Sequence, residues 1–279
     1  MDSERLDSPK EVRGNWAERR FLRAGDETLP GAKIGELEME LGAALEGGQI
    51  EILFQPQYSC PESVLIGAEA LARWRHPRHG TIGGDSLFAI AGRAGCDIDL
   101  SRHVMRRALA HAKHWNGDLR LSINVTAGDI EAQDFVESIG RALSESGFPA
   151  DRLTLEITEQ ALVNDVERSA RRLQRMADVG IRIALDDFGA GFCNFRYLKL
   201  LPLHALKLDR SMVAGIVDDA RDLAVLRGIV ALAHTLDLTV IAEGIETEEQ
   251  RLAVAREGCE IWQGFLGSRP MQAEDFGGL

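Results

Sequence analysis

Hydrophobic residues change their spacing repeatedly along the chain from residue 34 onward. Ile34, Leu37, Leu41 and Leu45 recur at helical spacing until Gly47-Gly48 ends the pattern. Strand-like apolar runs then occur at 51–58, 64–73, 119–126, 152–158, 181–187, 205–209 and 238–243. Amphipathic helical stretches separate them near 99–116, 133–147, 165–179, 219–235 and 247–257. This exchange of strand and helix predicts an α/β fold with a largely parallel sheet.

A parallel sheet of this kind is either open and doubly wound or closed into a barrel. No G-x-G-x-x-G motif follows the first strand, and the strands are too evenly spaced for two nucleotide-binding halves. We therefore expect residues 34–279 to form a TIM-type (β/α)8 barrel with one irregular or antiparallel strand. Residues 1–33 mix charges with Gly and Pro without periodicity, so we expect a flexible N-terminal segment or a linker.

The composition excludes several classes of protein. A net charge of −12 argues against binding of polymeric nucleic acid, which requires clustered Lys and Arg. The four cysteines lie far apart in the sequence, which favours reduced thiols in a cytoplasmic protein over a disulfide framework. No apolar run approaches the roughly 20 residues that cross a bilayer, so we expect no membrane contact by this domain.

Polar residues stand late in several predicted strands, where side-chain alternation turns them inward. In Leu119–Thr126 the apolar residues occupy the alternate positions and leave Asn124 inward. The same reasoning places Glu156, Asp186 and Lys207 inside the barrel, and Glu69, Arg73 and Glu243 complete a ring at its mouth. Inward polar groups from several strands would be destabilising without a metal or ligand, and barrel enzymes carry their active sites at this end.

The adjacent carboxylates Asp186 and Asp187 end a short apolar run and precede a glycine-rich turn. Such a pair repels itself, and a divalent cation that both groups face would compensate. The alternative is that the two residues only open a turn and cap the following helix.

With these residues assembled, the chain resembles the EAL-domain family of cyclic di-GMP phosphodiesterases. The naming triplet stands at Glu69-Ala70-Leu71, and the other motifs follow in family order at the expected intervals. They are Gln55-Pro56-Gln57, the Asn124 strand, Glu156-Ile-Thr-Glu159, Asp186-Asp187-Phe-Gly, Lys207-Leu-Asp-Arg210, Ala242-Glu-Gly-Ile-Glu246-Thr and Gln263-Gly-Phe.

The resemblance implies metal-dependent hydrolysis of cyclic di-GMP to linear pGpG with two Mg²⁺ or Mn²⁺ ions. Oxygen-only ligands suit such hard cations, and two ions can activate a water for in-line attack on phosphorus. By the same resemblance, one ion is held by Glu69, Asn124, Glu156 and Asp186, and the second by Asp186, Asp187 and Glu243.

The resemblance also implies individual roles for other residues. Lys207 orients or helps to deprotonate the attacking water, beside Glu69 and Glu243 as further catalytic residues. Arg73 clamps a phosphate, because a guanidinium donates two parallel hydrogen bonds. Substrate contacts extend to Gln55, Gln263 and Glu246, although either glutamine alone could be an ordinary surface residue.

The loop after the paired aspartates departs from the family pattern. Ala190, Phe192, Cys193 and Asn194 stand where the family carries three hydroxyls and a phenol. Since that loop is expected to couple metal binding to dimerisation, with Glu159 as its anchor, the departure bears on regulation more than on the metal ligands.

We further expect a homodimer in which the Asp187–Tyr197 loop and the helix after Lys207 lie near the partner. Phe188, Phe192, Phe195 and Tyr197 place four aromatic rings within ten residues, more apolar surface than a solvated loop normally carries. The alternative is that these rings fold back into the barrel. The competing functional hypothesis is a catalytically silent cyclic di-GMP receptor, although this chain lacks none of the expected metal ligands.

Overall fold

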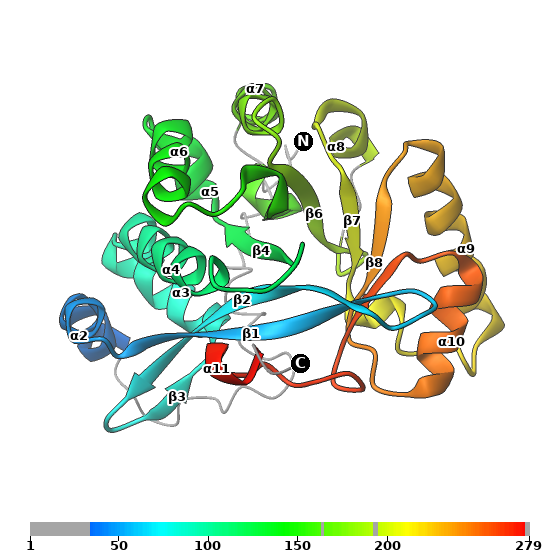
Figure 1. The fold of residues 1–279 in the computed structure, drawn as a ribbon, viewed down its shortest axis with the longest axis horizontal. Coiled ribbons are helices and arrows are strands. Elements are labelled where there is room, and N and C mark those ends of the chain that lie inside the picture. The colour runs from blue at the N-terminus through cyan, green and yellow to red at the C-terminus, as the bar shows by residue number, and fades with distance from the viewer. Residues whose placement is uncertain (1–33, 163–164, 192–194, 277–279) are drawn as a thin grey trace, which may run out of the picture.

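A computed structural model describes residues 34–162, 165–191 and 195–276 of the chain (Figure 1). Residues 1–33, the expected flexible segment or linker, lie outside the described residues. In the described ranges, no helix is both long enough and apolar enough to cross a membrane.

Eight strands close into a barrel, as the hydrophobic pattern predicts. Each hydrogen-bonds to its neighbours in the order β1-β2-β4-β5-β6-β7-β8-β9, and β9 returns to β1. The strands are β1 (Ile50–Ser59), β2 (Leu65–His76), β4 (Arg120–Val125), β5 (Leu153–Thr158), β6 (Arg182–Phe188), β7 (Ala205–Leu208), β8 (Thr239–Ala242) and β9 (Ile261–Gln263). β1 runs antiparallel to both β2 and β9, which confirms the expected antiparallel strand.

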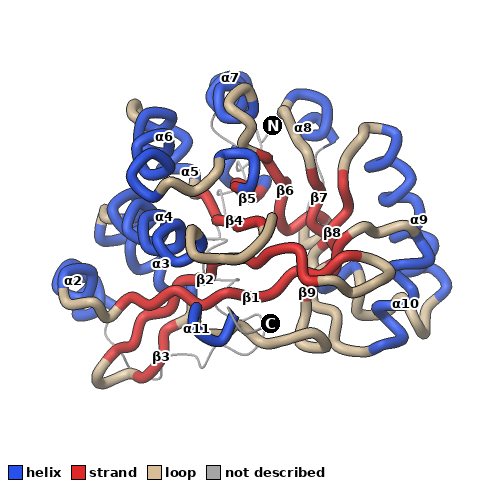
Figure 2. The backbone as a smooth tube through the Cα atoms, in the orientation of Figure 1, coloured by secondary structure: helices blue, strands red, loops and turns tan. Residues whose placement is uncertain are grey.

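Helices surround this ring on its outer side (Figure 2). The longer ones are α2 (Ile34–Glu46), α3 (Gly84–Ala94), α4 (Asp97–Ala112), α6 (Phe135–Ser146), α7 (Val166–Ala177), α9 (Ala220–Thr235) and α10 (Glu248–Glu257). Shorter ones are α5 (Ala127–Glu131), α8 (Phe195–Leu200) and α11 (Ala273–Phe276), together with the 3-10 turns Ala150–Arg152, Glu159–Leu162 and Arg210–Met212.

Local sequence explains where several helices begin. Thr126 and Asp129 form a reciprocal capping box at the start of α5, and Thr247 forms another with Gln250 at α10. Asp165 caps α7 through the backbone N–H of Arg168. These caps fix the points at which the chain leaves the barrel mouth and turns back along its outside.

The hydrophobic pattern did not predict two of the strands. β9 is three residues long, and β3 (Gly80–Ile82) pairs only with the far end of β2, outside the ring. Three residues are too few to display an alternating pattern. α3, which begins at Gly84, was also not predicted.

The aromatic residues at the end of β6 and after it correct part of the predicted exposed surface. Phe188 and Tyr197 are buried in the barrel's own hydrophobic core, which is the alternative considered above. Tyr197 lies in α8 rather than in a loop. Phe195 remains 60% exposed. Phe192 lies outside the described residues, as do Cys193 and Asn194.

Candidate active site

The barrel interior is built in two layers, a small apolar one below a polar one. Ala184, Ala205 and Ile241 form a buried cluster that is separate from the main core between strands and helices. Two residues further along the same strands, or just past the end of β8, stand Asp186, Lys207 and Glu243. Because alternate residues share a face of a strand, the inward side changes from apolar to ionic toward the carboxyl end of the barrel.

Lys207 lies at the centre of the polar layer and is 1% exposed. Its Nζ atom lies within ion-pair distance of four carboxylates. These are Glu156 at 2.6 Å, Glu243 at 2.7 Å, Asp186 at 3.1 Å and Glu69 at 3.5 Å. The structure therefore brings together residues from β2, β5, β6 and β7 and from the end of β8.

One ammonium group cannot neutralise four carboxylates, and the ionisation of the cluster reflects this shortage. Burial disfavours charge on Lys207, but the four acids raise its pKa well above the usual range. Burial raises the pKa of Glu243 to about 8 despite the charge of Lys207. Burial, together with Glu69 and Asp186, likewise raises the pKa of Glu156 well above its ordinary value. The metal-free cluster thus holds more carboxyl groups than its single cation can keep ionised.

Glu69 is the best-compensated member of the cluster. Burial opposes its ionisation, but Lys207 and hydrogen bonds from Gln263 and Asn124 more than offset this, so its pKa is lowered. Gln263 Nε2 donates to Glu69 Oε2 at 2.8 Å, and Asn124 Nδ2 donates to Glu69 Oε1 at 2.7 Å. Glu69 is therefore held in a fixed orientation by neutral donors on both oxygens.

Two glutamines on β1 extend this network. Gln263 Nε2 also lies 3.2 Å from Gln55 Oε1, and Gln57 Nε2 donates to Gln263 Oε1 at 3.0 Å. Gln57 is only 4% exposed and was not among the predicted site residues. Its spacing of two from Gln55 on the same strand is a signal that could have identified it.

Asp187 lies at the rim of the site rather than among the groups facing Lys207. Its φ is +57°, and its backbone N–H donates to Asp186 Oδ1 at 2.8 Å. The pairing of β6 with β7 is irregular between Leu185 and Phe188, which frees this segment from regular alternation. Asp187 thus lines the cavity above the cluster.

A cavity of about 630 Å³ opens over the polar layer. Arg73 lines it, and its Nη1 atom donates to the backbone oxygen of Ala72 at 2.8 Å. Glu246 also lines it, where its Oε1 atom pairs with Arg210 Nη2 at 2.9 Å. Arg210 stood in a recognised motif without a predicted role, and only the folded chain shows its partner. A second arginine therefore reaches the mouth of the cavity.

Glu159 opens a 3-10 turn directly after β5. This places it three residues beyond Glu156, at the barrel mouth. Its expected role as anchor of the following loop stays a prediction.

The donor set fits a hard divalent cation. Its side chains offer carboxylate and amide oxygens only, and Glu156 Oε1 is buried without a hydrogen-bond partner. Within the described residues, no three His, Cys, Asp or Glu side chains already converge in a metal-binding arrangement. The reason is visible in the distances, because the ammonium of Lys207 lies among the carboxylates. A bound cation would stabilise the ionised carboxylates and lower their raised pKa values.

Comparison with known proteins places this site in a family. The EAL domain profile matches residues 38–270. The bifunctional diguanylate cyclase/cyclic di-GMP phosphodiesterase MucR of Pseudomonas aeruginosa is 35% identical over 243 residues, covering 86% of this chain and 36% of that protein. The cyclic di-GMP phosphodiesterase NbdA of the same organism is 36% identical over 240 residues, covering 85% and 31% respectively.

The chain thus spans about a third of the length of these curated relatives. Among solved structures, the PaMucR phosphodiesterase in complex with c-di-GMP superimposes with a TM-score of 0.81 at 35% identity, covering 86% of this chain and 99% of that one. The sequence match and the shared barrel agree, and the chain belongs to the EAL domain family.

Proposed function

We propose that this chain hydrolyses cyclic di-GMP to linear pGpG in a reaction that depends on two Mg²⁺ or Mn²⁺ ions. The observation that carries the proposal is the convergence of Glu69, Glu156, Asp186 and Glu243 on one buried lysine at the carboxyl end of an EAL barrel. Relatives named as cyclic di-GMP phosphodiesterases support the same reaction.

In this proposal, each ion is assigned a set of oxygen ligands. Glu69, Asn124, Glu156 and Asp186 would hold one ion, and Asp186, Asp187 and Glu243 the second. When bound, such ions lower the pKa of a water and stabilise the charge on the leaving oxygen. The network on Glu69 keeps that carboxylate ionised and oriented before any cation arrives.

Lys207 acts in the proposal as an orienting donor. Of the two roles considered for it, deprotonating water requires a neutral amine, whereas the surrounding acids raise the pKa of Lys207 well above its usual range. The charged ammonium instead holds the acids in place and can donate a hydrogen bond to the attacking water.

The cavity suits a ligand of this class. Its volume of about 630 Å³ lies within the range of small-molecule sites. Arg73 and Arg210 offer guanidinium groups at the mouth, where they can meet phosphates, and Gln55, Gln263 and Glu246 supply further polar contacts.

The proposal is tested by incubating the purified chain with cyclic di-GMP and Mg²⁺ or Mn²⁺ and separating the products by chromatography. We expect pGpG from the wild type, and no pGpG from Glu69→Ala. Glu249→Gln, on an exposed carboxylate of α10, is the matched control and should retain full turnover. Turnover retained in Glu69→Ala would remove Glu69 from the site.

A second function, metal-independent reception of cyclic di-GMP, draws support from the four contacts of Lys207. In that case the ammonium stays among the carboxylates and the cavity binds the ligand without cleaving it. Tight binding in the presence of metal with no pGpG would favour the receptor over the hydrolase.

We also propose a homodimer that acts in the cytoplasm. Phe195 of α8 and Val225 of α9 are 60% and 51% exposed and belong to the segments expected at the interface, and Leu200 and Val217 near them are 37% and 48% exposed. A group of large apolar side chains at the surface is typical of a protein contact. The free thiols of Cys60, Cys96 and Cys259 accord with a reducing compartment.

A further inference from the structure

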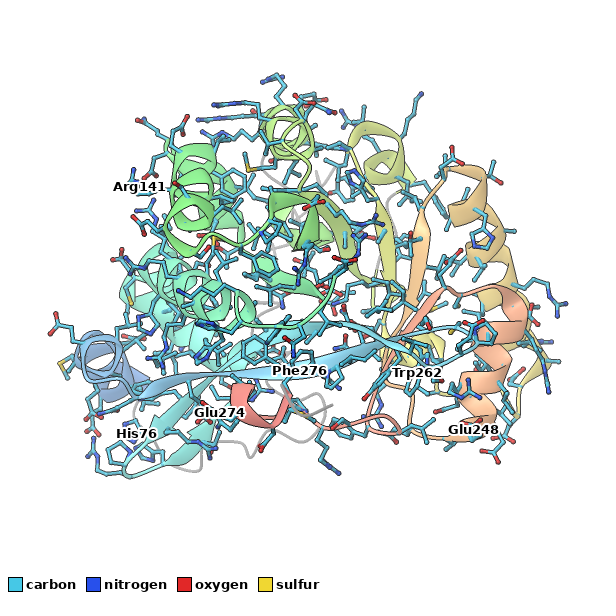
Figure 3. All side chains as sticks on the ribbon, in the orientation of Figure 1. His76, Arg141, Glu248, Trp262, Glu274 and Phe276 are labelled. Atoms are coloured by element: carbon cyan, nitrogen blue, oxygen red, sulfur yellow. The ribbon has the colours of Figure 1, made fainter. Side chains whose placement is uncertain are left out.

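A second cavity lies between α4 and α6, outside the barrel, and the proposed function does not use it. Its volume is about 220 Å³. The two helices pack against each other, and Val125 at the end of β4 forms part of the wall. Arg141, labelled on α6 in Figure 3, is one of the lining residues.

The inner wall of the cavity is apolar. Val125, Phe135, Ile139 and Ala142 are each at most 7% exposed, and Met105 adds a flexible thioether. A flat ring suits such a wall, because thioether sulfur makes favourable contacts with aromatic edges. A cavity of about 150 Å³ is known to hold benzene, so this one has room for one ring and a small substituent.

The rim of the cavity carries arginines that lack anionic partners. Arg102 is paired with Asp134 at 2.6 Å. By contrast, the guanidinium groups of Arg106 and Arg141 form no ion pair or hydrogen bond with any part of the chain that the structure describes. They come from α4 and α6 respectively, so they face the opening from two sides.

The lining holds three acidic residues beside its three arginines, but two of these acids already have partners. Asp129 already accepts hydrogen bonds from Ser101 at 2.6 Å and from the hydroxyl of Thr126 at 2.7 Å. Asp134 is paired with Arg102, so Glu145 is the remaining acidic residue of the lining beside the unpaired guanidinium groups of Arg106 and Arg141. The guanidinium groups of Arg106 and Arg141 therefore keep unused hydrogen-bond donors, from which one carboxylate of an incoming ligand can accept.

We propose that the cavity between α4 and α6 binds a small aromatic monocarboxylate. The ring lies against Phe135, Ile139 and Met105, and the carboxylate receives hydrogen bonds from Arg106 and Arg141. This site is separate from the cyclic di-GMP cavity and does not rest on the proposed hydrolysis. Asn124 lies in the wall of both cavities, and because its side chain points into the barrel, its backbone amide is the natural reporter of occupancy.

Benzoate is the probe, titrated into the whole chain and followed by NMR chemical shifts, with benzyl alcohol and acetate as controls. We expect saturable shifts with benzoate at the Asn124 amide and at Ile139. Benzyl alcohol lacks the charge and acetate lacks the ring, so each should bind at least roughly tenfold more weakly. Equal binding of benzyl alcohol, or of acetate, would overturn the assignment, as would the absence of shifts at roughly 10 mM benzoate.

Variants locate the site without depending on catalysis. Arg106→Met and Arg141→Met should each weaken benzoate binding roughly tenfold, because each removes a charge-assisted hydrogen bond. Arg171→Met, on the exposed face of α7, is the matched control and should leave it unchanged. Ala142→Leu should block binding by filling the cavity. Unchanged affinity in both rim variants would overturn the proposal even if Ala142→Leu fails to fold.

Discussion

Replacing Lys207 with methionine should destabilise the metal-free protein and make its stability depend more strongly on bound metal. Methionine keeps the length of the side chain but removes the charge. Lys207 is the cation that contacts all four acids of the cluster, at 2.6–3.5 Å. Without it, buried carboxylates face one another and must either repel or take up protons.

The cost in the metal-free protein follows from the burial of the cluster. Removing one partner of a buried ion pair costs about 3–5 kcal/mol. In a chain of this size, each kcal/mol shifts the melting temperature by about 2–4 °C. We therefore expect the metal-free Lys207→Met variant to melt roughly 6–20 °C below the wild type.

Adding Mg²⁺ or Mn²⁺ should stabilise the Lys207→Met variant more than the wild type. In the wild type a cation competes with the ammonium for the same carboxylates, whereas in Lys207→Met it does not. A ligand at a hundred times its dissociation constant stabilises a fold by about 2.7 kcal/mol, and each tenfold gain in affinity adds about 1.4 kcal/mol. The metal-induced rise in melting temperature should thus be larger in the variant, although pGpG formation falls.

Differential scanning fluorimetry with EDTA and across a metal titration measures both effects. Lys113→Met, on the exposed lysine that follows α4, should match the wild type throughout. The reasoning is refuted if metal-free Lys207→Met melts with the wild type, or if metal stabilises the variant less.

Three further predictions concern pH, assembly and the choice of metal. Burial raises the pKa of Glu243 to about 8, above the roughly 4.3 of an unfolded glutamate, so the stability of the metal-free protein falls as pH rises between these two values. Glu243→Gln should reduce this fall, measured as melting temperature against pH in EDTA, and an unchanged slope would contradict the prediction. Val225→Glu should shift a dimer toward monomer in light scattering across a concentration series, whereas Val179→Glu, at a 58% exposed position after α7, should not; a wild-type monomer at every concentration would exclude the dimer. Ca²⁺ should fail to support pGpG formation, because it prefers longer bonds and more ligands than Mg²⁺; equal rates with both ions would count against a geometrically strict site.

Strand alternation predicted several of the polar side chains that enter the barrel, although it missed Gln57. Asn124, Glu156 and Lys207 each lie among apolar residues of opposite parity, and the barrel keeps that parity along each strand. The same rule is less informative at Asp187, where an irregular pairing and a positive φ interrupt the alternation. Local pattern therefore predicts the members of the ionic layer better than its rim.

Side-chain contacts between residues far apart in the sequence could not be predicted from the sequence pattern. Arg210 meets Glu246 because the neighbouring strands β7 and β8 end side by side, and Gln57 meets Gln263 because barrel closure pairs β1 with β9. The unpredicted strand β9 makes that closure, since it pairs with both β8 and β1. Burial of Phe188 likewise depends on tertiary packing, which an aromatic-rich segment alone does not reveal.

Isotope transfer from water tests the central claim most directly. The wild type is incubated with cyclic di-GMP and Mn²⁺ in ¹⁸O-water, and the product is analysed by mass spectrometry. If a water attacks phosphorus while the bond to the 3′ oxygen breaks, pGpG gains one ¹⁸O atom, and the label resides in its terminal phosphate. Recovery of intact cyclic di-GMP, or of pGpG without the label in that phosphate, would contradict the account.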